Sequence, residues 1–299
     1  MSTTILDLPD QEFILPGTRA CAGCGLPIAY RFILKALGPK TIMTHGASCL
    51  TVLHGIYPKT PVAINVVNNT FAGTAASAAG LVAGLKATGR EDYTVLAMAG
   101  DGGTFDMGIQ GLSGAAERQT DFIYVCYDNE AYMNTGVQRS SATPTGAITT
   151  TTPVVPKEQP KKDFIRIMEA HHPAYLASSC SSYPADIYEK LLKAKPIKGT
   201  RFIHLVAPCP AGWGFPTKDT VKIGRLAVET GVVVLFEVED GVFRLTGKSL
   251  NMAKSGRKRP VEEYLKLQGR FKMMSAEQSA DFQRQTDRLW EQYLKRAGF

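Results

Sequence analysis

Two cysteines three positions apart, Cys21 and Cys24, lie in the glycine-rich stretch GTRACAGCG at residues 17–25. The chain has six cysteines, unevenly spaced, and its first residues, MSTTILDLPDQEF, lack the basic start and apolar core of an export signal. We therefore expect a cytoplasmic protein whose cysteines bind metal or stay as thiols, and not a disulfide framework. From the cysteines alone, zinc and an iron–sulfur cluster both stay open, because each accepts four thiolates.

A second chemical motif follows the apolar run 93–99, in the stretch AGDGGTFDMG. Gly100, Gly102 and Gly103 would let backbone N–H groups approach a phosphate where a helix begins, near residue 106 or 107. A carboxylate in such a turn, here Asp101, repels phosphate unless a divalent cation lies between them, and Mg²⁺ commonly bridges carboxylates to phosphates. The turn predicts a magnesium-bound diphosphate, with a helix-capping role for Asp101 as the alternative.

The next apolar run, 122–127, ends in a loop that carries Asn129, which follows Asp101 by 28 residues. Because the carboxyl ends of neighbouring parallel strands meet at one edge of a sheet, the Asn129 amide oxygen would lie near Asp101. Together with a backbone carbonyl, it would complete the oxygen shell of one magnesium ion.

A Gly-Asp-Gly turn followed after 25 to 30 residues by an asparagine loop resembles the thiamine diphosphate motif. With YDNEAYMNTGVQRSSATPTGA (127–147), APCPAGW (207–213) and the cysteine turn, residues 17–240 resemble the beta subunit of pyruvate:ferredoxin oxidoreductase and related 2-oxoacid:ferredoxin oxidoreductases. The resemblance is specific, because independent motifs occur in the order and spacing of that family.

The resemblance implies a role for each matching position of the thiamine site. Asp101 and Asn129 would hold Mg²⁺ through their side chains and Ala131 through its carbonyl, while Gly100, Gly102 and Gly103 face the diphosphate. Asn134 would face the thiazolium ring and the substrate as the catalytic residue, and Thr135 would contact the cofactor. Because Asn134 begins the sequence Asn-Thr-Gly, a simple turn residue is the alternative.

The resemblance also implies ligands for one 4Fe–4S cluster. Cys21 and Cys24 match the CxxC pair of the family, Cys49 its third ligand and Cys209 its fourth. Next to a thiamine site this favours iron over zinc, because the reaction needs an electron acceptor. The remaining cysteines, Cys126 and Cys180, fit no ligand spacing and are expected to be ordinary thiols.

The implied function is that of a subunit. In the family, thiamine diphosphate, Mg²⁺ and the cluster convert pyruvate and coenzyme A to acetyl-CoA and CO₂, and electrons pass to ferredoxin. The glutamate that activates the cofactor would lie on an alpha subunit, and ferredoxin-like clusters on gamma and delta subunits, because this chain lacks CxxCxxCxxxCP runs. Some family members have glutamate two positions after the second cysteine, where this chain has Leu26. A cofactor contact is then lost, or another subunit supplies it.

Two other functions stay open from the sequence. The same residues would serve another 2-oxoacid, such as 2-oxoisovalerate, 2-oxoglutarate or oxalate, because the alpha subunit would recognise much of the substrate. Alternatively, the chain is a zinc-stabilised α/β module that binds a nucleotide.

Composition narrows the class of partner. A net charge of +7 attracts anions weakly, but the basic run AKSGRKRP (253–260) lacks the interleaved aromatic residues of a nucleic-acid surface. A solvated face or a subunit contact is favoured. The longest run of small apolar residues, 72–85, is too short for the ~20 residues that cross a bilayer, so we expect no membrane span.

These motifs must be positioned by alternating strands and helices. The patterns predict strands over 41–44, 62–67, 93–99, 122–127, 175–178, 202–207 and 232–238, and helices over 27–37, 74–86, 109–118, 165–171, 185–192 and 221–229. This alternation is typical of an α/β fold with a mostly parallel sheet covered by helices on both faces, here the thiamine diphosphate-binding fold.

Two segments depart from the alternation. Residues 140–162 are rich in Thr, Pro and Lys and predict a long functional loop. In the tail, Ser275 and Gln278 have capping-box spacing before an amphipathic helix that would pack on its own domain or on a partner. We expect a thiamine diphosphate-binding domain with the cluster site over 1–256 and a C-terminal helical extension over 257–299.

Overall fold

The computed structural model describes residue 4, residues 7–55 and residues 58–299. Its centre is a single sheet with the strand order β2-β1-β3-β4-β6-β5-β7-β8. The six strands from β2 to β5 pair in parallel, and β7 and β8 are antiparallel. The strands are β1 Thr41–Gly46, β2 Asn65–Asn69, β3 Thr94–Gly100, β4 Phe122–Asp128, β5 Tyr175–Cys180, β6 Thr200–Val206, β7 Phe236–Glu239 and β8 Val242–Leu245.

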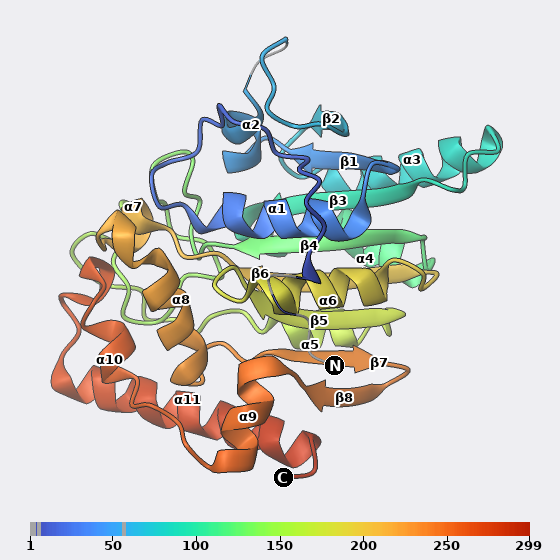
Figure 1. Ribbon diagram of the computed structural model, residues 1–299. Helices are drawn as coiled ribbons and strands as arrows, with labels where there is room; N and C mark the ends of the chain where they lie inside the picture. Colours follow the sequence, from blue (N-terminus) through green and yellow to red (C-terminus); the bar gives the residue numbers. More distant parts are fainter. Residues whose placement is uncertain (1–3, 5–6, 56–57) are drawn as a thin grey trace.

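Helices cover both faces of this sheet (Figure 1). Side chains alternate along β3, so that Leu96 and Met98 pack in one core while Val95 and Ala97 pack in the other. The first core contains α1 (Gly25–Leu37), α2 (Cys49–His54) and α6 (Pro184–Ala194), and the second contains α3 (Thr74–Ala87), α4 (Ile109–Glu117) and α5 (Phe164–Glu169). The predicted α/β architecture is confirmed.

A third apolar cluster lies beyond the carboxyl end of β6, around Val206 and Trp213. It joins α7 (Pro210–Trp213) and α8 (Thr220–Glu229) to α10 (Glu262–Leu265). Its position places the segment APCPAGW beside the strand ends where the predicted site residues lie.

The sequence prediction was wrong at the far edge of the sheet. The apolar run 232–238 forms a strand only from Phe236, and this strand pairs antiparallel with β5 and then turns back into β8. The turn contains Asp240 and Gly241 with positive φ angles of 50° and 73°, the conformation that an Asp-Gly hairpin favours. The helices α2, α7, α9 (Gly247–Ser255) and α10 were also not predicted; α2 and α7 are too short to show a periodic pattern.

Residues 140–162 contain no helix or strand, as predicted. Lys157 holds the loop together from inside, because its buried ammonium group donates to the carbonyl oxygens of Thr143 at 2.5 Å and Pro160 at 3.1 Å. The loop is therefore an ordered part of the fold, with its own hydrogen-bonded centre.

The C-terminal tail ends in the long helix α11 (Ala276–Arg296). The predicted capping box is confirmed, since Ser275 and Gln278 each accept a hydrogen bond from the other's backbone N–H. Trp290 is buried in the second core with residues of the sheet, so α11 packs on the protein's own sheet. In the described part of the chain no helix is long and apolar enough to cross a membrane.

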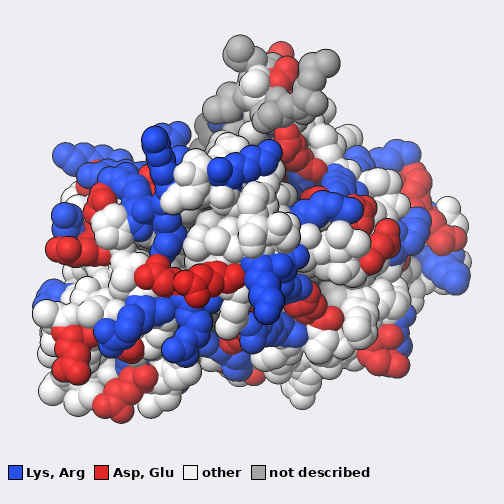
Figure 2. Space-filling view, turned by 90° about the horizontal axis from the view of Figure 1, so that it is seen from below, with Lys and Arg blue, Asp and Glu red and all other residues white. Residues whose placement is uncertain are grey.

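The basic run 253–260 covers the end of α9 and the connection to α10, and it forms ion pairs. Lys258 pairs with Asp287 of α11, and Arg259 pairs with Glu229 at 3.1 Å and with Glu263. Figure 2 shows that basic and acidic side chains are mixed on the face seen from below in Figure 1. Part of the basic excess is thus matched by acidic neighbours within the fold.

Candidate functional site

The carboxyl ends of β1, β3 and β4 open onto a cavity of about 520 Å³, which we name the edge cavity. All eight residues predicted for the thiamine site line it, together with Cys49 of the predicted cluster set. The sequence reading missed Phe71 and Tyr132, among other lining residues; Phe71 lies two residues after the end of β2, and this position near a strand end is the signal that would have found it. The predicted residues in its wall are Gly100, Asp101, Gly102, Gly103, Asn129, Ala131, Asn134 and Thr135.

The glycine turn after β3 is tighter than predicted. Instead of an α-helix starting near residue 106, residues Gly102–Asp106 form one π-helical turn, closed by the hydrogen bond from Met107 N–H to Gly102 O at 3.1 Å. A Cβ atom on Gly102 would lie 2.2 Å from the ring of Tyr132, so only glycine fits there. Single π-helical turns of this kind are frequent at functional sites.

Asp101 is buried between β3 and the loop that follows β4. Burial raises the pKa of Asp101 well above its usual range, and the nearby carboxylate of Asp128 raises it further. Ser140 donates a hydrogen bond to Asp101 Oδ2 at 2.5 Å and opposes that shift. A buried carboxyl group of this kind favours a cation as partner, because a cation removes the cost of its charge.

Three oxygen atoms converge beside Asp101. The end of the Asn129 amide that carries its oxygen lies 3.1 Å from Asp101 Oδ1 and 3.0 Å from the carbonyl oxygen of Ala131. With the amide turned over, its NH₂ group would donate to both atoms instead. Octahedral Mg²⁺ binds oxygen at about 2.0–2.1 Å, which places neighbouring ligands about 2.9–3.0 Å apart. The end of the Asn129 amide therefore lies at about the spacing of neighbouring magnesium ligands from each of the two other predicted ligand atoms.

Asn134 and Thr135 lie in the turn between Tyr132 and Gln138, which form an isolated bridge. Both side chains are exposed, and the Thr135 hydroxyl donates to Gln138 Oε1 at 2.6 Å. Asn134 thus occupies a turn and also lines the edge cavity, so the two readings of this residue are compatible.

The four predicted cluster cysteines, named the cysteine set here, come from three separated segments: the turn with Cys21 and Cys24, the start of α2 with Cys49, and the segment with Cys209. Cys24 caps α1, Cys49 begins α2, and Cys209 caps α7. A hydrogen bond from Gly25 N–H to Pro208 O, at 3.2 Å, joins the first segment to the last. Burial raises the pKa of Cys49 to about 12, and the charges of the three other cysteines raise it further, so all four sulfurs face a common region.

Backbone amides surround two of these sulfurs. Burial raises the pKa of Cys24 to about 11, but the N–H of Leu26 opposes the shift. Burial also raises the pKa of Cys209, and the backbone N–H groups of Gly212 and Ala211 oppose this shift. Leu26, where some family members have glutamate, is buried in the first core, and its backbone points toward the cysteine set. Cys126 is buried in the second cluster, and Cys180 is buried in the third cluster, against which Cys209 also packs.

Among residues 4, 7–55 and 58–299, no three His, Cys, Asp or Glu side chains are arranged to hold a single metal ion. The magnesium triad uses one carboxylate, one amide and one backbone carbonyl. Within the described residues, the cysteine set is likewise not arranged around a single ion. A tetrahedral zinc ion with Zn–S bonds of about 2.3 Å would draw four sulfurs to within about 3.8 Å of one another.

A charged network supports the loop that carries Asn129. It consists of five side chains, which we name the anchor network: Asp128, Glu130, Lys161, His204 and Arg270. Lys161 Nζ lies 2.6 Å from Asp128 Oδ2 and 2.8 Å from Glu130 Oε1. His204 Nε2 also contacts Asp128, at 2.8 Å, and Arg270 Nη1 lies 2.6 Å from Glu130 Oε2. The sequence analysis missed the network, because no local motif connects its members.

The chain was compared with known families and proteins. Residues 46–205 match the family model described as "Thiamine pyrophosphate enzyme, C-terminal TPP binding domain". This segment contains every residue predicted for the diphosphate and magnesium, and Cys49 of the cysteine set.

Two relatives of known name align over almost the whole chain. "Pyruvate synthase subunit PorB" of Methanothermobacter thermautotrophicus is 47% identical over 291 residues, which cover 96% of this chain and 99% of that protein. "Ketoisovalerate oxidoreductase subunit VorB" of Pyrococcus horikoshii is 44% identical over 302 residues, which cover 98% and 96%.

One solved structure has the same fold over most of its length. A chain of the 2-oxoglutarate:ferredoxin oxidoreductase from Magnetococcus marinus superimposes with a TM-score of 0.57 at 22% identity. The match covers 68% of this chain and 67% of that chain.

Proposed function

Because this chain belongs to the family of 2-oxoacid:ferredoxin oxidoreductase beta subunits, we propose that it holds the thiamine diphosphate and exports the electrons of such an enzyme. The observation that carries the proposal is the position of Cys49. It lines the edge cavity together with the predicted thiamine residues, and it faces the three other cysteines of the set. One short helix therefore borders both predicted cofactor sites.

In this proposal Mg²⁺ is held by Asp101 Oδ, Asn129 Oδ1 and the carbonyl oxygen of Ala131. The support is that one end of the Asn129 amide lies 3.0–3.1 Å from both the carbonyl oxygen of Ala131 and Asp101 Oδ1. The diphosphate would lie against Gly100, Gly102 and Gly103, which line the edge cavity.

When bound, thiamine diphosphate would supply a nucleophilic carbon and an electron sink for decarboxylation. The role of this chain is to bind the cofactor and to orient it toward the substrate. The edge cavity fixes the diphosphate end against the sheet, and Asn134 borders its open side, where it would meet the ring and the substrate. The buried Asp101 carboxylate and the metal neutralise each other and keep that end of the cavity in a fixed geometry.

Cys21, Cys24, Cys49 and Cys209 would ligate one 4Fe–4S cluster as a one-electron acceptor. A cluster is proposed over a single zinc ion because the reaction needs an electron acceptor, and four thiolates are the ligands that such a cluster requires. Backbone N–H groups at Cys24 and Cys209 stabilise the thiolate form that a cluster requires.

Pyruvate is the proposed substrate, with coenzyme A as the acyl acceptor and ferredoxin as the electron acceptor. The basis is the 44–47% identity to proteins named as pyruvate synthase subunits. The ketoisovalerate oxidoreductase subunits, at 43–44% identity, make 2-oxoisovalerate the second candidate. The alpha subunit would complete the substrate site, and gamma and delta subunits would carry electrons onward. Within the chain, we propose residues 1–256 as the cofactor-binding domain and 257–299 as its helical extension.

The test is made on the complex purified without oxygen. We expect a brown protein with iron, acid-labile sulfide and bound thiamine diphosphate, whereas zinc without thiamine would favour the nucleotide-binding module. Ferredoxin reduction is then measured with pyruvate, 2-oxoisovalerate, 2-oxoglutarate and oxalate. Pyruvate should give the highest kcat/KM; little turnover with pyruvate would refute the substrate assignment and leave the cofactor assignment standing.

A further inference from the structure

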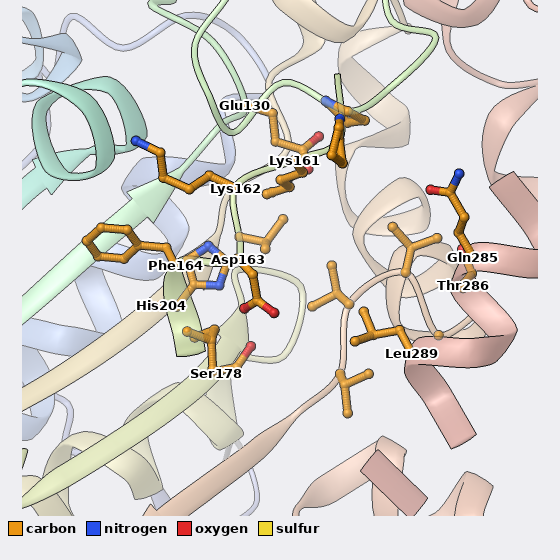
Figure 3. Close-up of a pocket in the computed structure, with 18 of the residues that line it drawn as sticks. Glu130, Lys161, Lys162, Asp163, Phe164, Ser178, His204, Gln285, Thr286 and Leu289 are labelled. Atoms are coloured by element: carbon orange, nitrogen blue, oxygen red, sulfur yellow. The ribbon is translucent and has the colours of Figure 1, made fainter. Parts of the chain in front are cut away.

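Lys161 is a partly exposed lysine that none of the predicted cofactor contacts involves, and it pairs with two buried carboxylates. Lys161 comes from the end of the long loop 140–162 and reaches the two carboxylates on either side of Asn129, those of Asp128 and Glu130. Figure 3 shows Glu130, Lys161 and His204 on one side of a cavity of about 300 Å³, opposite Gln285 and Leu289 of α11.

Hydrogen bonds hold the backbone carbonyl groups of residues 128–130, whereas the Asn129 side chain is not part of these contacts. Asp128 O accepts from Ala207 N–H at 2.8 Å, Asn129 O from Trp213 Nε1 at 2.8 Å, and Glu130 O from Thr143 Oγ1 at 2.7 Å. The Asn129 amide is left to face Asp101 and Ala131. The surrounding contacts thus orient the one side chain that the metal would need.

Glu130 gives this loop its shape. Its φ of +67° lies in the left-handed region, which a residue with a long side chain seldom adopts. Because that conformation reverses the chain direction, the carbonyl of Ala131 turns back to within 3.0 Å of the Asn129 amide. Lys161 and Arg270 hold the Glu130 side chain from two directions, and both of these cations are largely shielded from solvent.

The loop 140–162 therefore contacts both halves of the metal site. Ser140, at its start, donates to Asp101 Oδ2, and Lys161, at its end, joins Asp128 to Glu130. We propose that Lys161 is a positioning residue, which holds the left-handed turn at Glu130 so that Asn129 and Ala131 present their oxygens to the magnesium of thiamine diphosphate. This inference rests on the proposed function and adds a residue to it.

A positioning role and a purely electrostatic role of Lys161 predict opposite changes in metal affinity when the lysine is replaced. Replacing Lys161 by methionine leaves one more uncompensated negative charge near the metal, and charge alone would tighten the binding of a cation. If Lys161 acts by position, the same variant binds the cation more weakly. Loss of a residue that orients metal ligands typically costs 10- to 100-fold in affinity.

The experiment uses the assembled complex, stripped of metal with a chelator and saturated with thiamine diphosphate. Mn²⁺ is the probe, and its binding is followed by electron paramagnetic resonance. We expect Lys161→Met to raise the dissociation constant for Mn²⁺ about 10- to 100-fold. An unchanged or lower dissociation constant would overturn the proposal.

The matched control is Lys190→Met. Lys190 is a second lysine that pairs with a carboxylate, and it is more deeply buried than Lys161; it lies 2.7 Å from Asp186, donates to Ser178 O at 2.7 Å and does not line the edge cavity. Its loss should lower thermal stability to a similar degree and leave the Mn²⁺ constant unchanged. If Lys190→Met weakens Mn²⁺ binding equally, the effect of Lys161 is one of general stability and the proposal is wrong.

A second variant covers the case in which Lys161→Met does not fold. Thr143→Val removes the hydroxyl that holds Glu130 O without changing any charge. We expect about a fivefold weaker Mn²⁺ affinity, the equivalent of one hydrogen bond, and an unchanged affinity would contradict the positioning role. If the wild-type complex itself binds no thiamine diphosphate, the proposed function fails first, and this inference with it.

Discussion

Trp213 donates its indole N–H to the carbonyl oxygen of Asn129 at 2.8 Å, across 84 residues of sequence. Trp213 ends the short helix α7, which Cys209 caps, and the guanidinium of Arg270 lies 3.9 Å from its ring centroid. The contact therefore ties the segment of one predicted cluster ligand to the loop of one predicted magnesium ligand.

Trp213→Phe tests this tie. Phenylalanine keeps an apolar ring in the third cluster but leaves the Asn129 carbonyl without its donor, which costs about 1–3 kcal/mol. We expect the complex to bind thiamine diphosphate and Mg²⁺ about 5- to 10-fold more weakly, as measured by isothermal titration calorimetry. Equal affinity in the variant would mean that the Asn129 loop is held without Trp213.

Asp101→Ala should abolish cofactor retention. The variant loses the only carboxylate of the oxygen triad, so neither the metal nor the diphosphate that it neutralises would stay bound. The measurement is thiamine diphosphate content after desalting. Asp121→Ala, at the opposite end of β4 and paired with Lys198 at 3.1 Å, serves as the control and should keep the cofactor. Full occupancy in Asp101→Ala would contradict the metal assignment.

Cys209→Ser should separate the two predicted cofactors. Serine is a poor cluster ligand, so iron and sulfide content and ferredoxin reduction should fall sharply, while thiamine diphosphate binding is retained in part. Cys180→Ser, a buried cysteine outside the cysteine set, should keep its iron. Normal iron content in the Cys209 variant would remove this residue from the ligand set.

His54 makes the stability of the fold depend on pH. Burial lowers the pKa of His54 to about 3, and the neighbouring ring of His45, at a centroid distance of 4.6 Å, lowers it further. Between pH 3 and the ordinary histidine pKa of about 6.5, the unfolded chain binds a proton that the folded chain rejects, so stability is lost as the pH falls through this range.

The comparison of wild type with His54→Phe isolates this effect. Relative to the variant, wild type should lose up to ~1.4 kcal/mol of unfolding free energy per pH unit between about pH 6.5 and pH 5, above the range where most carboxylates titrate. Urea unfolding of the complex at both pH values is the measurement. Parallel pH profiles for the two proteins would show that His54 does not titrate in this way.

The sequence was sufficient for the features that local patterns determine. Strands β3 and β4 and the residues directly after them, Gly100 to Gly103 and Asn129, lie where predicted, because parallel strands bring their carboxyl ends to one edge. The hairpin at Asp240 and Gly241 was missed although its Asp-Gly signal was present; the preceding valine run was read as one longer strand.

The anchor network was beyond the reach of sequence reading for a physical reason. The Asn129 loop meets Lys161 of the long loop, His204 of β6 and Arg270 of the tail only in the folded chain. The hydrogen bonds of Lys161 and His204 to this loop span 31 to 76 residues of sequence. A lysine in a polar loop reads as a solvated surface charge. Only the folded structure shows that Lys161 forms ion pairs with two buried carboxylates.

The place of Cys49 at the start of α2 has a consequence for how electrons would leave the protein. Since this residue borders the edge cavity and also faces the other three sulfurs, donor and acceptor would sit in one rigid body, with no joint between them. Their separation would be constant through the catalytic cycle. The docking of the next electron carrier would then determine when electrons leave the protein, and no motion inside this chain would be needed.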